Sequence, residues 1–178
     1  INTAKGNERW IRTIAEPEII DGKCVRIVGA LQDIDELKRT QLSLEYAHNL
    51  YNDIARYSRT IVWEVDTNGL FTYVSSIANE LLGYTADELV GKMHFYDLCP
   101  IEQREEVKNS ALAVFKTKES FHNFVNPIVT KSGEVLYVFT NGIPILDKQG
   151  NLMGYKGSDT DITEQTKIKT AFDSQIAF

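Results

Sequence analysis

The feature that most constrains the fold of this sequence is an ordered internal repeat. Glu8–Asp21 aligns with Glu134–Asp147 at an offset of 126, and Gly22–Glu36 aligns with Gly150–Glu164 at an offset of 128. The two extra residues fall in a turn, where insertions are tolerated. The collinear matches are Glu8/Glu134, Ile19/Ile145, Asp21/Asp147, Gly22/Gly150, Gly29/Gly157, Asp33/Asp161, Ile34/Ile162 and Glu36/Glu164. Each copy is therefore predicted to be a β-hairpin that ends in a helix.

The two copies are preceded by very different lengths of chain. Almost no residues precede the first copy, whereas enough residues for a small α+β domain precede the second. We therefore expect the chain to begin inside one domain and to contain a complete second one. The predicted parts are 1–36, a C-terminal hairpin of a truncated domain; 37–58, a linker helix; 59–165, a complete domain; and 166–178, the start of an output helix.

The linker segment 37–58 contains no Gly or Pro, and its apolar residues recur with a seven-residue period. Asp35 or a neighbour can cap its N-terminus. The period is typical of the a/d seam of a parallel coiled coil, formed here by Leu37, Thr40, Leu44, Ala47, Tyr51 and Ile54. A homodimer follows from this interpretation. The alternative is an amphipathic helix that packs on its own domain.

The segment 59–165 alternates between strand and helix signals. A strand pair surrounds the Asn68-Gly69 turn, and Thr85 opens a short helix through a capping box with Glu88. The remaining predicted elements are helices at 77–82 and 100–116 and strands at 121–129, 134–146 and 151–158. This order predicts an α+β fold, with a five-stranded antiparallel sheet and helices on one side.

The same segment resembles the PAS sensor domain family. The motifs that carry the resemblance are Trp63–Gly69, Leu82–Lys92, Asp97–Pro100, Lys131–Glu134 and Gly157–Glu164. The match covers 59–165 as a full domain and 5–36 as the C-terminal part of another. Ser75 departs from the pattern, because the family often has Asn after the second strand. The resemblance implies a PAS-like fold preceded by a long coiled-coil helix.

The repeated Asp-Ile motif lies where the last strand gives way to a helix. Thr163 is predicted to be an N-cap, and Asp161 is close enough to favour the positive end of the helix. Asp33 and Asp35 occupy the matching places in the first copy. The resemblance implies that this motif couples PAS cores to output helices. A purely structural cap is the compatible alternative.

Catalytic and metal sites lack sequence support. His48 has no phosphoacceptor context, and neither His94 nor His122 has a partner at zinc-ligand spacing. Cys24 and Cys99 are expected to be thiols in a reducing compartment, because they are isolated from each other. We therefore predict that this fragment is not an enzyme.

Net charge and hydropathy restrict partners. A formal net charge of −6 argues against nucleic acids and anionic membranes, which need a surplus of Lys and Arg. No apolar run approaches the roughly 20 residues that span a bilayer, and no signal-peptide pattern is present. We expect a cytoplasmic region, within a parent protein that could be tethered to a membrane.

Cofactor and ligand predictions follow from the resemblance. Haem-binding PAS domains often take an axial His from the long helix, but 100–116 contains none and His94 is the nearest candidate; Cys99 lacks the flavin-adduct context. No haem or flavin is therefore expected. Aromatic residues could instead line a pocket for a small organic ligand, or simply fill the core. They are Trp63, Tyr73, Phe115, Phe124, Tyr137 and Tyr155.

The function predicted from these patterns is non-catalytic sensing and relay in a multidomain sensor, with a histidine kinase or diguanylate cyclase as the parent. A small ligand or partner would be perceived, and the signal would pass through helical linkers to an output domain of the same polypeptide. The alternative is a dimerisation or protein-interaction module without a ligand. A haem- or flavin-bearing sensor is the less favoured third class.

Overall fold

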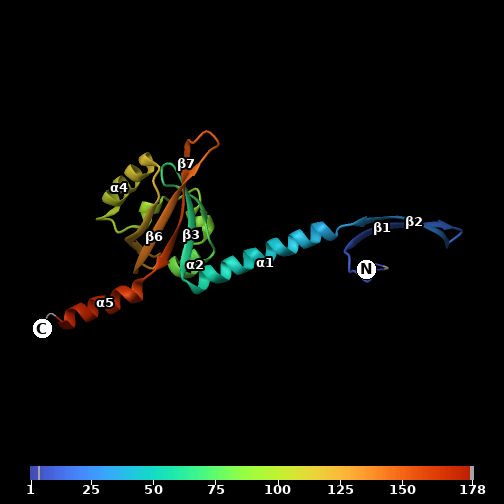
Figure 1. Ribbon diagram of the computed structural model, residues 1–178, viewed down its shortest axis with the longest axis horizontal. Helices are drawn as coiled ribbons and strands as arrows, with labels where there is room; N and C mark the ends of the chain where they lie inside the picture. The colour runs from blue at the N-terminus through green and yellow to red at the C-terminus, as the bar shows by residue number, and fades with distance from the viewer. Residues whose placement is uncertain (4, 177–178) are drawn as a thin grey trace. The chain divides into compact units, whose positions relative to one another are not determined.

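The computed structural model describes residues 1–3 and 5–176, with side chains through Asp173 apart from residue 4. The chain divides into two units, Ile1–Tyr51 and Asn52–Phe178. Helix α1 (Asp35–Tyr57) begins in the first unit and ends in the second (Figure 1). Because this helix lacks Gly and Pro and carries Asp35 and Glu36 in its first turn, its 23 residues agree with the predicted linker helix.

The first unit contains a two-stranded antiparallel hairpin, β1 (Ile11–Ile20) and β2 (Lys23–Asp33). Asp21 and Gly22 form the connection, and both have positive φ, as a tight two-residue turn requires. Large apolar side chains of this unit are exposed, namely Trp10, Ile14, Ile19, Ile27, Val28 and Leu31. The hairpin predicted for the first copy is confirmed.

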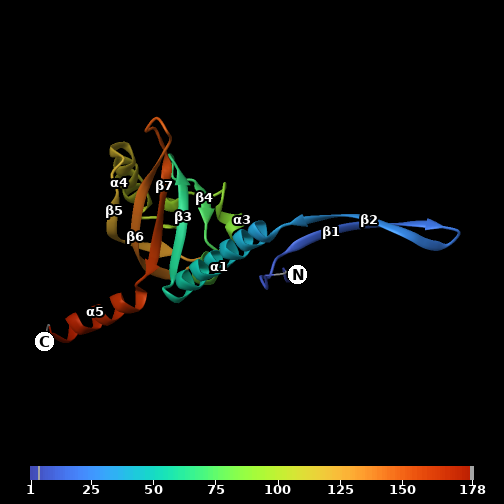
Figure 2. The same cartoon turned by 45° about the vertical axis from the view of Figure 1, so that its right-hand side comes forward.

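The second unit contains a five-stranded antiparallel sheet in the order β4-β3-β7-β6-β5 (Figure 2). The strands are β3 (Thr60–Asp66), β4 (Phe71–Val74), β5 (Phe121–Val129), β6 (Val135–Leu146) and β7 (Leu152–Asp161). Strand β7 is central, between β3 and β6. The predicted α+β fold with five antiparallel strands is confirmed.

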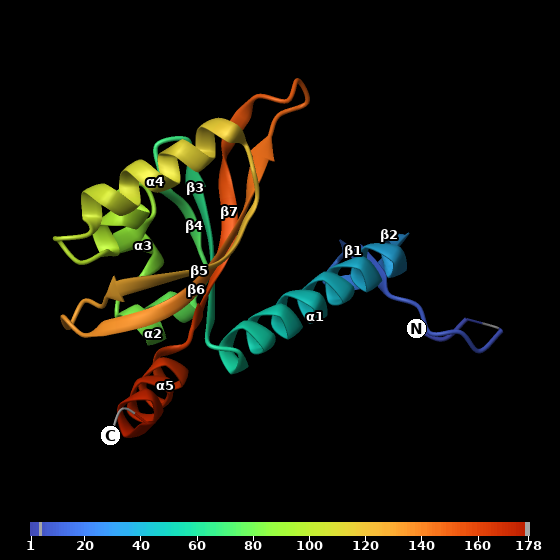
Figure 3. The same ribbon diagram turned by 60° about the vertical axis from the view of Figure 1, so that its left-hand side comes forward.

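Helices cover one face of this sheet, and a further helix follows β7 (Figure 3). They are α2 (Ile77–Leu82), α3 (Ala86–Leu89), the 3₁₀ helix η1 (Phe95–Leu98), α4 (Arg104–Thr117) and α5 (Thr163–Ile176). The capping box of Thr85 and Glu88 is present as predicted. The prediction that Pro100 opens the long helix is wrong: Gln103 N donates to Pro100 O at 3.0 Å in a separate turn, and the helix begins at Arg104.

The core of the second unit lies between the sheet and these helices. Alternate residues of β3 point inward, so Ile61, Trp63 and Val65 are buried. The side chains of Leu89 and Tyr155 are fully buried. Each fully buried apolar side chain stabilises the fold by roughly 1.5–3 kcal/mol.

The strand registers refine the sequence repeat. In the first hairpin, Glu18 pairs with Arg26 before a bulge, and in β6 and β7 Ile145 pairs with Gly154 before a bulge. These pairs correspond at an offset of 127 in the first strand and 128 in the second. The predicted offset of 126 for the first strand is thus one residue short, and the extra turn residue is single. The corrected offset aligns identical residues in the first strands, Thr13 with Thr140 and Pro17 with Pro144.

Candidate functional site

A cavity of about 330 Å³ lies between α4 and the sheet of the second unit. Its apolar lining comes from the strands, α4, η1 and the loops between them, and includes Trp63, Phe71, Phe95, Phe115, Phe121 and Phe124. Its polar lining includes Gln103, Glu106, Ser110, Asn126, Thr140 and Asp159. The cavity therefore combines aromatic walls with a few polar groups, as small-molecule sites do.

Asp159 is a half-buried acid in the cavity wall. Its Oδ1 is shielded from solvent and has no hydrogen-bond partner, and the same holds for Nε1 of Trp63. Burial raises the pKa of Asp159 to about 6, and the nearby Thr140 hydroxyl and Trp63 indole offset only part of that rise. The hydroxyl oxygen of Thr140 accepts a hydrogen bond from Asn126 Nδ2 at 2.9 Å. The cavity thus contains unsatisfied polar capacity next to aromatic surface.

Cys99 also lines the cavity, and burial raises the pKa of its thiol to about 11. The thiol is therefore protonated near neutral pH, and its nucleophilicity is low. Cys24 is exposed in the first unit. Neither cysteine forms a disulfide in the described residues.

Three of the predicted pocket aromatics, Trp63, Phe115 and Phe124, line this cavity. Phe124 is on β5, and Phe115 comes from the last turn of α4. Their contact with a ligand stays a prediction. The structure also adds residues that sequence reasoning missed, above all Asp159, which stands in a run of polar residues without any apolar pattern.

The other three predicted aromatics do not line the cavity. Tyr73 pairs with Glu64 on the outward side of its strand, and Tyr137 precedes the buried Val138, so both point away from the core. Tyr155 faces inward but fills the core, because its ring stacks on Phe115 with centroids 4.1 Å apart. Its hydroxyl donates to the carbonyl oxygen of Glu119 at 3.0 Å.

The end of β7 and the start of α5 form a hydrogen-bonded junction. Asp161 Oδ1 accepts from Thr163 N at 2.9 Å, and Asp161 Oδ2 receives Nε and Nη2 of Arg59 at 2.9 and 2.6 Å. Burial alone would raise the pKa of Asp161, but the hydrogen bonds from Thr163 and Arg59 outweigh it and hold the pKa below its ordinary value. Asp161 is therefore a carboxylate that links the helix start to Arg59, in the turn before β3.

Thr163 acts differently from the predicted N-cap. Its Oγ1 accepts a hydrogen bond from Tyr137 N on β6 at 3.0 Å, while Asp161 receives the first helical amide. Ile162 N donates to the carbonyl oxygen of Tyr137 at 2.8 Å. The helix start is thus held at two places. Asp161 caps the helix and binds Arg59 before β3, and Thr163 joins the helix to Tyr137 of β6.

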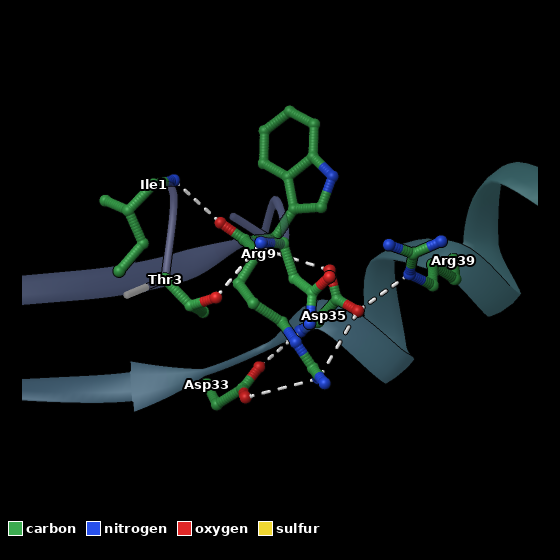
Figure 4. A network of polar contacts seen from close by, with 8 residues as sticks. Ile1, Thr3, Arg9, Asp33, Asp35 and Arg39 are labelled. Carbon is green, nitrogen blue, oxygen red and sulfur yellow. Dashed lines mark hydrogen bonds and ion pairs between the residues drawn. The ribbon is translucent and has the colours of Figure 1, made fainter. Parts of the chain in front are cut away.

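The first unit repeats this junction at β2 and α1 (Figure 4). Asp33 Oδ1 accepts from Asp35 N at 2.9 Å, as Asp161 accepts from Thr163. Trp10 N donates to Asp35 Oδ1 at 3.2 Å, as Tyr137 N donates to Thr163. Asp33 therefore caps α1, and Asp35 is its first residue, attached to the strand. The sequence had left the capping residue open.

Asp35 is also the centre of a charged cluster. Its side chain is only 6% exposed and receives Arg39 Nε at 2.7 Å, while Arg9 Nη1 lies 3.6 Å from Oδ2 (Figure 4). The hydrogen bond from Arg39 and the one from Trp10 N outweigh burial, so the pKa of Asp35 lies below its ordinary value. Each junction therefore contains an ionised carboxylate beside the helix start, Asp161 just before α5 and Asp35 in the first turn of α1.

The predicted dimer seam lies along α1. Its residues are Leu37, Thr40, Leu44, Ala47, Tyr51 and Ile54, and all six are exposed. Ala55 of the same helix is buried. The exposed apolar side chains are compatible with a partner, and dimerisation stays a prediction.

No helix of residues 1–3 and 5–176 is long and apolar enough to cross a membrane. In the same residues, no three His, Cys, Asp or Glu side chains are grouped so that they could hold a metal ion.

Comparison with known families identifies the second unit by sequence. The sequence profile of the family described as the PAS fold matches residues 71–158. These residues include β4, the helices over the sheet, β5, β6 and most of β7.

Two curated relatives match nearly the whole chain. An uncharacterized protein, y4lL, of Sinorhizobium fredii is 26% identical over 163 residues, which are 91% of this chain and 20% of that protein. The methyl sulfide methyltransferase-associated sensor of Methanosarcina acetivorans is 23% identical over 182 residues, covering 96% of this chain and 18% of that protein. The chain thus spans about a fifth of the length of these relatives.

Solved structures share the fold at low sequence identity. The N-terminal domain of a diguanylate cyclase with a PAS/PAC sensor from Marinobacter aquaeolei gives a TM-score of 0.53 at 15% identity, covering 60% of this chain and 98% of that one. A sensory box histidine kinase/response regulator from Burkholderia thailandensis gives 0.56 at 16%, covering 71% and 95%.

Proposed function

Because this chain contains a PAS domain, we propose that it is a non-catalytic sensory and relay region of a multidomain sensor protein. The cavity binds a small organic ligand, and the change in the sheet passes to α5. The observation that carries this proposal is on β7: Asp159 lines the cavity, and Asp161, two residues later on the same face, caps the helix. Ligand site and helix start therefore share one strand.

The parent protein in this proposal is a histidine kinase or a diguanylate cyclase. The fold shared with sensors of both kinds, and the small share of the relatives that the chain covers, support an output domain on the same polypeptide. Residues 1–36 are, in this proposal, the C-terminal hairpin of a truncated first copy of the domain, and the matching bulges and junctions support it. In this proposal α5 leads to the output domain; of the predicted output segment 166–178, residues 177–178 lie outside the described part of the chain.

Thr163→Ala is expected to leave the second unit folded but to loosen the start of α5. The change removes the acceptor of Tyr137 N, and one such hydrogen bond contributes about 1 kcal/mol, well within the margin of a domain. In hydrogen–deuterium exchange, the first-turn amides of α5 should exchange roughly fivefold faster, which corresponds to a local loss of about 1 kcal/mol. In the full-length protein, the response to the stimulus should change.

The matched control is Thr170→Ala, because the Thr170 hydroxyl donates to the Thr166 carbonyl within α5. This variant leaves the connection to β6 intact and should exchange like the wild type at the first turn. Loss of the whole thermal transition in Thr163→Ala would make the residue a structural one and contradict its relay role.

We also propose that α1 forms a parallel homodimer through the seam residues. Leu44→Asp is expected to convert the dimer to monomer while the second unit stays folded, because a charged group at a seam position loses its water on association. Leu42 is exposed on the same helix but lies off the seven-residue period, so Leu42→Asp is the control that should remain dimeric. Light scattering measures both masses. A monomeric wild type well above micromolar concentration would contradict the seam.

The second candidate function, a dimerisation module without a ligand, is favoured by the exposed seam alone. Native mass spectrometry of the purified chain separates the two functions. A co-purified small molecule, lost in a cavity variant, supports the sensor; an empty chain that binds no compound supports the dimerisation module.

A further inference from the structure

The unsatisfied groups in the cavity indicate what kind of molecule it accepts. Resting on the proposed function, we infer that the ligand is a small organic cation, an amine with a compact apolar or aromatic body, whose ammonium group binds the carboxylate of Asp159. Oδ1 of Asp159 is buried without a partner, so a donor from the ligand would supply the missing hydrogen bond. An ammonium group supplies both the donor and the opposite charge.

The charge of the lining has one sign. Asp159 and Glu106 are the ionisable carboxyl groups that line the cavity, and no Lys, Arg or His is among the described lining residues. Glu106 is exposed on α4, whereas the Asp159 carboxyl is buried on β7. A ligand carboxylate or phosphate would meet like charge and no cation, so the lining selects against anions.

The walls suit the body of such a ligand. Phe121 and Phe124 meet edge to face with centroids 5.9 Å apart, and both line the cavity with Trp63. Aromatic faces attract cations through the ring quadrupole, most strongly where water is excluded. The cavity volume of about 330 Å³ is near the lower end of ordinary ligand sites, roughly 300–1,000 Å³, so the molecule is small.

The internal repeat shows that the strand does not require an acid at this position. At the offset of 128 that the register establishes, Leu31 of β2 corresponds to Asp159 of β7. Gly29 and Gly157 correspond in the same strands, so the two backbones are comparable. The Thr140 hydroxyl and the Trp63 indole stabilise the Asp159 charge only in part, and its shielded Oδ1 lacks a hydrogen bond. An incompletely satisfied acid destabilises a fold, and such groups are typically retained at functional sites. Ligand binding accounts for Asp159 where folding does not.

The test compares three probes of similar size and different charge on residues 1–178: 2-phenylethylamine, 2-phenylethanol and 3-phenylpropionate. Isothermal titration calorimetry near pH 7.5 should show the amine binding at least tenfold more tightly than the alcohol and the carboxylate. Asp159→Asn and Asp159→Leu should reduce the amine to the affinity of the alcohol. Glu105→Gln is the control, because Glu105 is exposed on α4 and does not line the cavity, and it should change nothing.

Unfolding cannot imitate this result, because Asp159→Asn is expected to be more stable than the wild type. The inference is overturned if the alcohol or the carboxylate binds as tightly as the amine, if the amine keeps its affinity in both Asp159 variants, or if no probe binds. The relay itself is tested without any ligand, by a larger side chain on α4 that occupies the cavity. A wrong ligand class can therefore be distinguished from a wrong proposed function.

Discussion

Gly157→Val is expected to leave the chain without a folded second unit. Gly157 lies on central strand β7 against Trp63 and the carbonyl oxygen of Asn141. A Cβ at Gly157 would lie 2.6 and 2.8 Å from two ring atoms of Trp63 and closer still to the Asn141 oxygen. Overpacking a core lowers the free energy of unfolding by roughly 1–3 kcal/mol, and by more where the backbone of a neighbouring strand cannot move away.

The valine adds two further methyl groups at this contact, while the margin of a domain is only about 5–15 kcal/mol. Circular dichroism should therefore show no cooperative thermal transition for the second unit. Lys156→Val is the control: Lys156 is exposed on the opposite side of the same strand, where a β-branched residue fits well. A cooperative transition for Gly157→Val within a few degrees of the wild type would contradict the packing at this strand.

Asp159→Asn is expected to stabilise the second unit at neutral pH. Burial raises the pKa of Asp159 from 3.8 to about 6. The unfolded chain releases this proton near pH 4 and the folded chain near pH 6, so the folded state loses stability as the pH rises through that window. Between these two pKa values the free energy of unfolding falls by about 1.4 kcal/mol per pH unit, so the total loss is on the order of 3 kcal/mol above pH 6.

An uncharged amide avoids this loss, so the melting temperature of Asp159→Asn should exceed that of the wild type by at least about 5 °C at pH 7.5. Near pH 4.5 the unfolded chain has released most of this proton and the folded chain has kept it, so only about a third of the loss remains; near pH 3, where both states are protonated, the difference should nearly vanish. Asp173→Asn, a change at an exposed carboxyl of α5, should not produce this pH-dependent difference. Equal stability of Asp159→Asn and wild type at pH 7.5 would contradict a carboxylate that is destabilised by burial.

Local signals predicted the elements that local chemistry determines. The Asn68-Gly69 turn and the capping box at Thr85 need only nearby residues, and both are present. The inward positions of β3 also follow from simple alternation along one strand. The sheet, its neighbouring helices and the repeated hairpin could therefore be predicted from the sequence.

Which residues line the cavity depends on which strands lie side by side in the sheet, and local sequence signals do not give that strand order. Tyr73 and Tyr137 were plausible pocket residues by type, but their positions in the pleat direct them outward. Asp159 and Asp161 look alike in the sequence, yet one lines the cavity and the other caps a helix. An offset of 126 in place of 127 misaligns the first strands of the two repeat copies by one residue. Because side chains alternate between the two faces of a strand, this error matches inward residues of one copy with outward residues of the other.

In the proposed sensor, the occupancy of the cavity is relayed along β7 to α5. Ala111 lines the cavity from α4, whereas Ala113 is exposed on the same helix, so Ala111→Phe fills the cavity and Ala113→Phe is its matched control. Hydrogen–deuterium exchange at residues 163–166 is the most direct measurement. If the relay operates, exchange there should change several-fold in Ala111→Phe and not in Ala113→Phe, and the change should be lost when Thr163→Ala is added. Unchanged exchange at 163–166 in a folded Ala111→Phe variant would contradict it.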